Sequence, residues 1–186
     1  MTKPITIVAL GGSMRQRSIT RAVLQAALAI AEAQGAQTEL LDVRTLALPM
    51  YQPDFAISDY PSESQAGIQQ LLAGCRRADA MIWASPTYHG TLSGVVKNAI
   101  DFIDFMSDDS PAYLSGRAIG LISVNDSTTF TALMHSVHEL RGWLSPTQVE
   151  VNRNDFHEDL SVNNERTQKR LERLVTELVE FSRLKK

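Results

Sequence analysis

Two polar segments of the chain combine residue types that could bind a phosphorylated, flat-ringed ligand. Residues 11–20, GGSMRQRSIT, supply paired glycines, three hydroxyl groups and two arginines. Glycine lets the backbone approach a ligand closely, and phosphate is bound by arginine and by the amides that begin a helix. Residues 85–90, SPTYHG, follow the apolar run 80–84. Such loops, at the carboxyl ends of parallel strands, predict one ligand held at one edge of a sheet.

The first segment departs from two familiar phosphate loops. It lacks the second and third glycines of the GxGxxG dinucleotide motif, and no lysine stands where a GxxxxGK[ST] loop needs one. Ser18 or Thr20 could also cap the helix that follows. The alternative for this segment alone is therefore an ordinary polar turn with a capped helix.

Apolar runs and helical periodicity predict the elements that position these segments. Five strands are expected, at residues 5–10, 38–42, 80–85, 118–124 and 148–151. Five helices are expected, at residues 20–34, 63–78, 93–107, 130–143 and 163–184, with an irregular, proline-containing loop at 48–61. Alternating strands and helices require a parallel sheet with right-handed crossovers. We expect an α/β, flavodoxin-like three-layer sandwich with a five-stranded parallel sheet of order 2-1-3-4-5, whose ligand lies beside the first and third strands.

Composition limits the classes of partner. The 186 residues, 44% hydrophobic and 21% charged, are typical of a single globular domain spanning 1–186. A net charge of −3 gives no electrostatic case for nucleic acid. No apolar run is long enough for a secretory signal or a membrane span. The single cysteine, Cys75, fits a reducing compartment, so we expect a cytoplasmic protein.

With both segments in view, the chain resembles the NAD(P)H-dependent FMN reductase family of flavodoxin-like proteins. The family motif G-S-x-R-x-x-S is matched by residues 12–18, GSMRQRS. The motif S-P-x-Y-x-G is matched by residues 85–90, and the G and K-N-A-I-D that follow it by residues 94–101, GVVKNAID. The resemblance covers residues 5–151 in element order. It implies a reductase in which a hydride passes from NADPH or NADH to FMN.

The resemblance also implies which residues contact FMN. It assigns the phosphate to the first segment, at Ser13, Arg15, Ser18, Ile19 and Thr20. It assigns the isoalloxazine ring to the second segment, at Pro86, Thr87, Tyr88, His89 and Gly90. After the fourth strand, where members often carry Gly-Gly, it implies contacts from Ser123, Asn125 and Asp126. Without glycine there, we expect a less close approach of the backbone to the ring, and Asp126 would add negative charge if it faces the ring.

In this interpretation the flavin carries the chemistry, so we expect no catalytic side chain and no metal. Arg15 or Arg17 would help to hold the phosphate of NADPH. Reduced flavin would pass electrons to an acceptor or a partner enzyme. One alternative is a reductase with tightly bound FMN that acts on quinones, azo dyes or metal oxyanions. Two others are a non-catalytic electron carrier of flavodoxin type and a flavin-binding regulator without turnover.

Outside the site, residues 94–106 carry apolar side chains around more of the predicted helix than one packed face requires. The second side would contact another subunit, which predicts a homodimer or homotetramer. The alternative is that residues 108–116 fold back over it. His135, His138 and Glu139 lie close together on another predicted helix, where a solvated face is favoured over a metal site.

Overall fold

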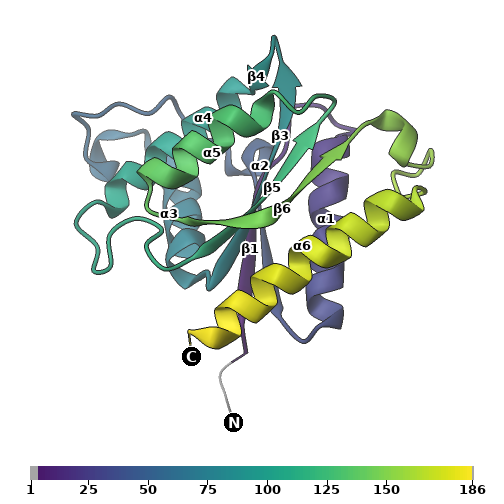
Figure 1. The fold of residues 1–186 in the computed structure, drawn as a ribbon. Helices are drawn as coiled ribbons and strands as arrows, with labels where there is room; N and C mark the ends of the chain where they lie inside the picture. The colour runs from purple at the N-terminus through teal and green to yellow at the C-terminus, as the bar shows by residue number, and fades with distance from the viewer. Residues whose placement is uncertain (1–3, 186) are drawn as a thin grey trace.

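Apolar, β-branched runs form the central sheet of the computed structural model, which describes residues 4–185 (Figure 1). The strands are β1 (Thr6–Gly11), β2 (Gln37–Asp42), β3 (Ala80–Tyr88), β4 (Thr91–Leu92), β5 (Ala118–Val124) and β6 (Trp143–Val151). Five of them pair in parallel in the order β2-β1-β3-β5-β6, and β4 pairs antiparallel with the end of β3. The expected order of parallel strands is confirmed, but the prediction of five strands misses β4.

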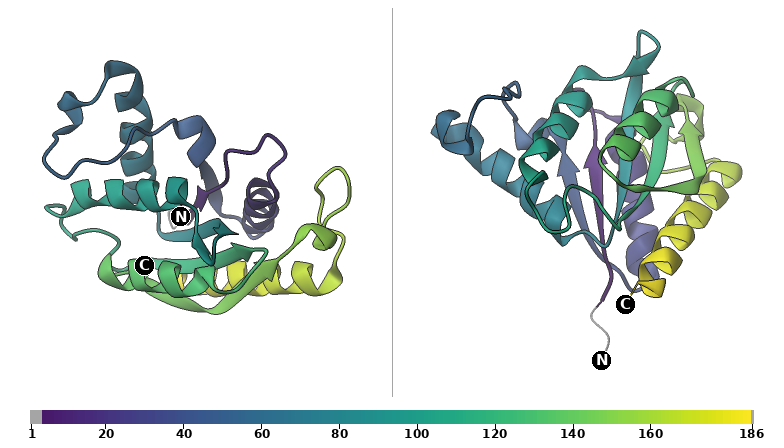
Figure 2. Two further views of the ribbon diagram at one scale, coloured as in Figure 1. Left: turned by 90° about the horizontal axis from the view of Figure 1, so that it is seen from above. Right: turned by 60° about the vertical axis from the view of Figure 1, so that its left-hand side comes forward.

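Helices cover both faces of the sheet and complete the three layers (Figure 2). They are α1 (Ile19–Ala33), α2 (Val43–Leu46), α3 (Ser62–Arg77), α4 (Gly94–Asp101), α5 (Thr129–Glu139) and α6 (Glu165–Leu184). Short 3-10 segments are η1 (Ile57–Asp59), η2 (Phe102–Met106) and η3 (Arg153–Asp155). The first and last helices pack on one face, and α3, α4 and α5 pack on the other.

Side chains of the central strands alternate between two apolar cores. On β3, Met81 and Trp83 belong to the core beneath α3, α4 and α5. Ile82 and Ala84 belong to the core beneath α1 and α6, and all four side chains are fully buried. Burial on both faces explains why the strands are continuous apolar runs in the sequence.

The fourth predicted helix, 130–143, is wrong at its end, and the strand predicted to start at 148 begins earlier. The helix α5 ends at Glu139, because Arg141 adopts a φ of +62° and the Gly142 N–H donates to the Val137 carbonyl at 2.9 Å. Trp143 then pairs with Ala118 as the first residue of β6. A left-handed turn of this kind ends a helix without interrupting its apolar periodicity.

The helix predicted at 93–107 is α-helical only to Asp101 and continues as the 3-10 segment η2. Its second apolar side is covered mainly by residues 48–61. The rings of Tyr51 and Tyr60 lie 5.4 and 5.5 Å from the ring of Phe102. Leu114 adds a buried contact to the same core. The apolar side chains around this helix are therefore largely buried by other parts of the same chain.

Two further findings concern residues 4–185 as a whole. Every helix there falls short, in length or in apolar content, of what a bilayer crossing needs. His, Cys, Asp and Glu side chains of the same residues do not gather in groups of three that could hold a metal ion.

Candidate functional site

The carboxyl ends of β1 and β3 approach each other so closely that the turn after β1 requires glycine. Gly11 pairs with Ala84 at a φ of +152°, and a Cβ atom there would lie 2.0 Å from the Ala84 carbonyl oxygen. A Cβ atom at Gly12, whose φ is +120°, would lie 2.6 Å from the Asp42 carboxylate. A larger residue would push the backbone apart. The paired glycines therefore place the polar loop 13–18 directly at the edge of the sheet.

That loop is held in shape by its own serines. Ser13 and Ser18 are buried, and their hydroxyl groups are hydrogen-bonded at 3.0 Å. Ser18 Oγ also accepts from the backbone N–H of Arg21 at 3.1 Å and so caps α1. Arg21 braces the loop from outside by donating to the Gln16 carbonyl at 2.5 Å. The loop thus stands at the positive end of the α1 dipole, where a phosphate is favoured.

A cleft of about 280 Å³ opens between this loop and the ends of β3, β5 and β6. Seven of the predicted contact residues meet in it: Ser13, Arg15, Ile19, Thr20, Pro86, Tyr88 and Asn125. Arg17, Val124, Arg153 and Leu160 complete the lining. Three of the lining side chains are arginines, and no lining residue in the described part of the chain is acidic. The cleft is consequently a local positive site on a chain whose net charge is −3.

Residues 87–92 form a β-hairpin, where the sequence predicted a plain loop. Pro86 still belongs to the main sheet, and the next two residues pair with β4. His89 and Gly90, with φ values of +52° and +81°, form the two-residue turn that such a hairpin needs. The hairpin brings Tyr88, whose exposed fraction is 39%, to the wall of the cleft.

The loop after β5 forms its turn without the expected glycines. Asn125 has a φ of +85°, in the left-handed region that asparagine tolerates better than most residues. Its N–H donates to the Val151 carbonyl at 2.8 Å, which ties the end of β5 to the end of β6. A backbone shape that glycine usually supplies is therefore present, with an amide side chain at the cleft.

Asp126 is engaged within its own loop and lies outside the cleft lining. The backbone N–H of Thr128 donates to Asp126 Oδ1 at 2.7 Å, and this bond lowers the pKa of the exposed carboxyl. The Asp126 carbonyl accepts from the hydroxyl groups of Thr87, at 2.8 Å, and Ser123, at 2.5 Å. These bonds fasten the β5 loop to the hairpin after β3.

The predicted contact residues thus fall into two groups. Six of them lie outside the cleft lining and shape the loops behind it: Ser18, Thr87, His89, Gly90, Ser123 and Asp126. Sequence analysis missed Val124, Arg153 and Leu160, and it considered Arg17 as a phosphate-binding group without assigning it to FMN. Two of the missed residues come from the segment after β6, which holds four asparagines and two aspartates between 152 and 164. Turn-forming residues after a parallel strand were the signal that could have found them.

The missed segment folds back from the end of β6 to the start of α1 (Figure 1). Phe156 and Val162 form an antiparallel bridge, and we refer to residues 156–162 as the β6–α6 hairpin. The Arg17 guanidinium donates to the Glu158 carbonyl and so joins this hairpin to the loop after β1. The cleft is therefore walled on one side by a segment far away in the sequence.

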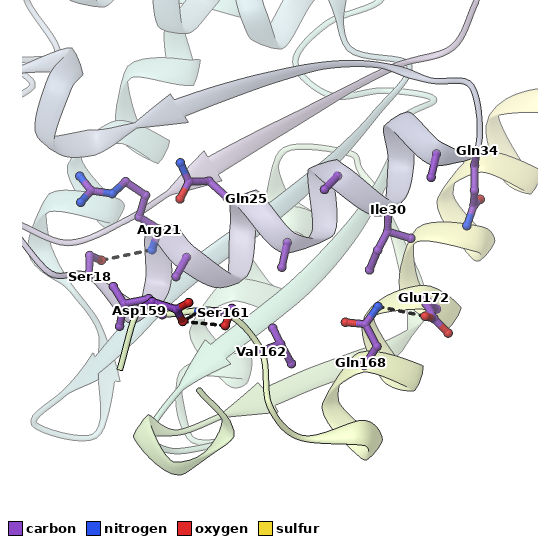
Figure 3. Close-up of a pocket in the computed structure, with 15 residues that line it drawn as sticks. Ser18, Arg21, Gln25, Ile30, Gln34, Asp159, Ser161, Val162, Gln168 and Glu172 are labelled. Carbon is purple, nitrogen blue, oxygen red and sulfur yellow. Dashed lines mark hydrogen bonds between the residues drawn. The ribbon is translucent and has the colours of Figure 1, made fainter. Parts of the chain in front are cut away.

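A larger groove, of about 830 Å³, lies on the other side of the same hairpin, between α1 and α6 (Figure 3). Several of its polar side chains are bonded to one another, as in the pair Gln168–Glu172 at 2.9 Å and the pair Ser161–Asp159 at 2.6 Å. The groove runs along the surfaces of α1 and α6 from the start of α1 to Gln34, and it is not lined by the ends of β3 and β5. The smaller cleft therefore remains the candidate site.

Cys75, the single cysteine, is fully buried. Burial raises the pKa of its thiol to about 12, which keeps the thiol protonated and unreactive at neutral pH.

Comparisons with known proteins show the family of the chain. The sequence matches the profile of the family described as NADPH-dependent FMN reductase over residues 5–156. It is 30% identical over 178 residues to an FMN-dependent NADPH-azoreductase of Staphylococcus saprophyticus, with 91% of each chain covered. It is 32% identical over 124 residues to an NAD(P)H-dependent FMN reductase of Pseudomonas aeruginosa, with 64% of this chain and 63% of that one covered.

Solved structures share the fold. FerB, a flavoenzyme NAD(P)H:(acceptor) oxidoreductase from Paracoccus denitrificans, superposes with a TM-score of 0.76 at 21% identity, over 97% of this chain and 98% of that one. Oxidised flavodoxin 1 from Bacillus cereus gives a TM-score of 0.59 at 14% identity, over 94% of this chain and 97% of that one. The α/β, flavodoxin-like fold is thereby confirmed.

Proposed function

The chain belongs to the NADPH-dependent FMN reductase family, and from that premise we propose that it binds FMN in the cleft between the β1 and β3 loops and reduces it with NADPH. The expected cofactors, FMN and NADPH, are those of the family. One observation carries the proposal: a cleft with three arginines and no acidic lining residue lies at the switch point of a flavodoxin-like sheet.

The residues present fit FMN at both ends of the cleft. A phosphate monoester carries a charge of about −1.5 to −2 at neutral pH. Arg15 and the start of α1 supply positive charge for it, and the hydroxyl group of Thr20 supplies a hydrogen bond. Tyr88, Pro86 and Asn125 stand at the other end, where a flat ring would lie against the hairpin and the β5 loop.

FMN, when bound, supplies the redox chemistry by taking up a hydride from NADPH and passing electrons on. The chain contributes binding and orientation. Asp, Glu, His and Cys are absent from the lining residues described, so no side chain there is suited to shuttle a proton at neutral pH. The Thr87 hydroxyl donates to the Asp126 carbonyl and joins the hairpin after β3 to the β5 loop, and these two segments would orient the ring.

The acceptor of the electrons has two candidates. In the first, FMN is itself the substrate and leaves after reduction. In the second, FMN stays bound and the electrons go to an azo dye, a quinone or a metal oxyanion. The second is favoured by the relative that shares 91% of its length with this chain, which is named an FMN-dependent NADPH-azoreductase.

Oxidation of NADPH by flavin-free protein, measured while FMN is titrated in, tests the function. We expect oxidation that depends on FMN. A rate that levels off at one FMN per chain and rises when an azo dye or quinone is added supports the bound-flavin mode. A rate that keeps rising far beyond one equivalent supports FMN as substrate. Absence of oxidation with NADPH and with NADH would overturn the enzyme proposal and favour a carrier or a regulator.

We also propose that the chain forms a homodimer or homotetramer through the face that carries α4. Residues 49–51 are fastened to α4 by hydrogen bonds with Asn98, at 2.7 and 2.9 Å, and Met50 there is 75% exposed. Half-buried Val95 and Phe105 lie on the same core. Light scattering should find more than one chain per particle. Met50→Glu should dissociate it, and Leu184→Glu, an equal change at another exposed position, should not.

NADPH is a reductant held inside cells, so we propose a cytoplasmic location. Fractionation of cells with an antibody against the chain tests this location. Recovery in an extracellular or envelope fraction would contradict it.

A further inference from the structure

Hydrogen bonds within the β6–α6 hairpin hold this segment in a defined shape. The His157 N–H donates to the Ser161 carbonyl at 2.9 Å. Asp159 accepts from the backbone N–H of Ser161 at 2.9 Å and from its hydroxyl group at 2.6 Å. Figure 3 shows this part of the hairpin standing beside the start of α1. A segment bonded in this way can present groups to a ligand in a fixed position.

Its base is fixed to the fold on both sides. The buried carboxylate of Asp155 accepts from the backbone N–H of Asn152 at 2.8 Å and from the side-chain amide of Asn164 at 2.6 Å. Asn164 caps α6, and the Asn163 N–H donates to the Asp155 carbonyl at 2.9 Å. The hairpin is therefore anchored to the end of β6 and to the start of α6.

Arg153 joins this hairpin to the cleft. Its Nη1 donates to the carbonyls of Phe156, at 3.0 Å, and His157, at 2.9 Å. Its Nε and Nη2 have no acceptor among residues 4–185, and the side chain lines the cleft opposite the loop after β1. Half of the guanidinium thus holds the hairpin, and the other half is free to bind a ligand.

The charge of the cleft suits a phosphate bound from both sides. Arg15 and Arg17 come from the loop after β1, and Arg153 comes from the segment after β6. In a cleft of about 280 Å³, just below the roughly 300–1,000 Å³ of typical ligand sites, groups on opposite walls can reach one bound anion. Arg17 already links the two walls by donating to the Glu158 carbonyl.

We propose that Arg153 binds the phosphate of FMN. By holding Arg153 in place, the β6–α6 hairpin determines the affinity of the chain for the flavin. This inference rests on the proposed function, because it requires FMN in the cleft. The loop after β1 supplies one half of the phosphate site, and the free Nε and Nη2 of Arg153 supply the other. Retention of FMN then depends on the hairpin, as the bound-flavin mode requires.

Comparison of FMN with riboflavin, which lacks the phosphate, tests the assignment. Arg153→Gln should raise the dissociation constant of FMN about tenfold or more and leave that of riboflavin within about twofold, as measured by flavin fluorescence. Arg153→Lys, which keeps the charge but loses the fork, should fall between. Arg166→Gln removes an equal charge from an exposed position on α6 outside the cleft and should change neither constant.

A measurement on the unaltered chain covers the case in which the variant disturbs the hairpin. FMN should slow hydrogen exchange at the backbone amides of residues 153–162, and riboflavin should not. Equal protection by both flavins would overturn the inference.

The other outcomes are equally decisive. If Arg153→Gln weakens the binding of FMN and of riboflavin alike, the residue stabilises the fold or contacts the flavin ring, and it does not bind the phosphate. If it raises only the KM for NADPH, Arg153 serves the nicotinamide nucleotide, and the inference is wrong. If the unaltered chain binds FMN no better than riboflavin, the phosphate site itself fails, and the proposed function with it. If only the predictions for the Arg153 variants fail, the proposed function is not contradicted.

Discussion

Asn125 illustrates how one residue preserves a turn that glycine usually makes. Its φ of +85° lies in a region that asparagine enters at modest cost and that β-branched residues avoid. The absence of Gly-Gly after β5 predicts a less close approach of the backbone to a flavin ring, and this stays a prediction. The structure shows that the turn itself forms without glycine, with the N–H of Asn125 donating to the Val151 carbonyl. A missing glycine therefore does not by itself remove the turn.

The effect of a substitution at Asn125 on stability should therefore depend on how readily the new residue adopts a positive φ. Asn125→Gly should change the free energy of unfolding by less than about 1 kcal/mol, since glycine adopts a positive φ freely. Asn125→Val should lower it by about 2 kcal/mol through strain. Asn154→Val, at an exposed position whose φ is not positive, is the control and should have little effect. Urea unfolding measures all three. Equal losses for Val at both positions would contradict the argument.

At the scale of elements, β6 joins the sheet with the help of α6. The register between β5 and β6 shifts between Ile119 and Leu121, which leaves polar groups of β6 without sheet partners. Glu177 of α6 accepts from the Ser145 hydroxyl at 2.6 Å and from the Thr147 N–H and hydroxyl at 3.0 and 2.7 Å. One carboxylate thus satisfies the irregular part of the strand that leads to the cleft.

Stability should depend on pH through this carboxylate. Burial tends to raise the pKa of Glu177, but hydrogen bonds from Ser145, Thr147 and Arg173 outweigh burial and lower it. A carboxyl with a lowered pKa stabilises the fold fully above its ordinary pKa of about 4.3, and the contribution is lost as pH falls through the lowered value. Glu177→Gln should therefore cost about 1–3 kcal/mol at pH 7.

Urea unfolding at pH 7, pH 5 and pH 3.5 checks this dependence. The difference in the free energy of unfolding between the Glu177→Gln variant and the unaltered chain should stay constant from pH 7 to pH 5. It should become smaller only below pH 5. Glu180→Gln, at an exposed position on the same helix, should show no gap at any pH. If the Glu177→Gln variant shows the same loss of unfolding free energy at pH 3.5 as at pH 7, the charge of Glu177 does not cause the stabilisation.

The elements themselves were predictable to different degrees, for physical reasons. Strands buried on both faces, such as β1 and β5, appear in the sequence as uninterrupted apolar runs, and their alternation with helices fixed the strand order. The end of α5, the hairpin with β4 and the β6–α6 hairpin are set by positive φ angles and side-chain hydrogen bonds. Such features leave no periodic signal. Part of the candidate site therefore escaped prediction at Arg153 and Leu160.

For the whole molecule, the distribution of charge matters more than its total. The chain carries a net charge of −3, yet the cleft at the switch point is lined by three arginines and no acidic residue of the described part. Interactions across more than about 10 Å are largely screened at 0.1 M salt, so a bound phosphate experiences mainly the nearby arginines. A flavin phosphate in the cleft is thus attracted by the nearby arginines, although the chain as a whole is negatively charged.

The sign of the salt dependence distinguishes these two influences. If the arginines of the cleft dominate, raising NaCl from 20 to 300 mM should weaken FMN binding by about three- to tenfold, because salt screens the attraction. If the net charge dominated, salt would strengthen binding. Fluorescence titration measures the dissociation constant directly. Riboflavin, which carries no phosphate, serves as the control, and its constant should stay the same across the series. FMN binding that strengthens with salt would contradict a local positive site and require anion repulsion by the chain as a whole to control access to the cleft.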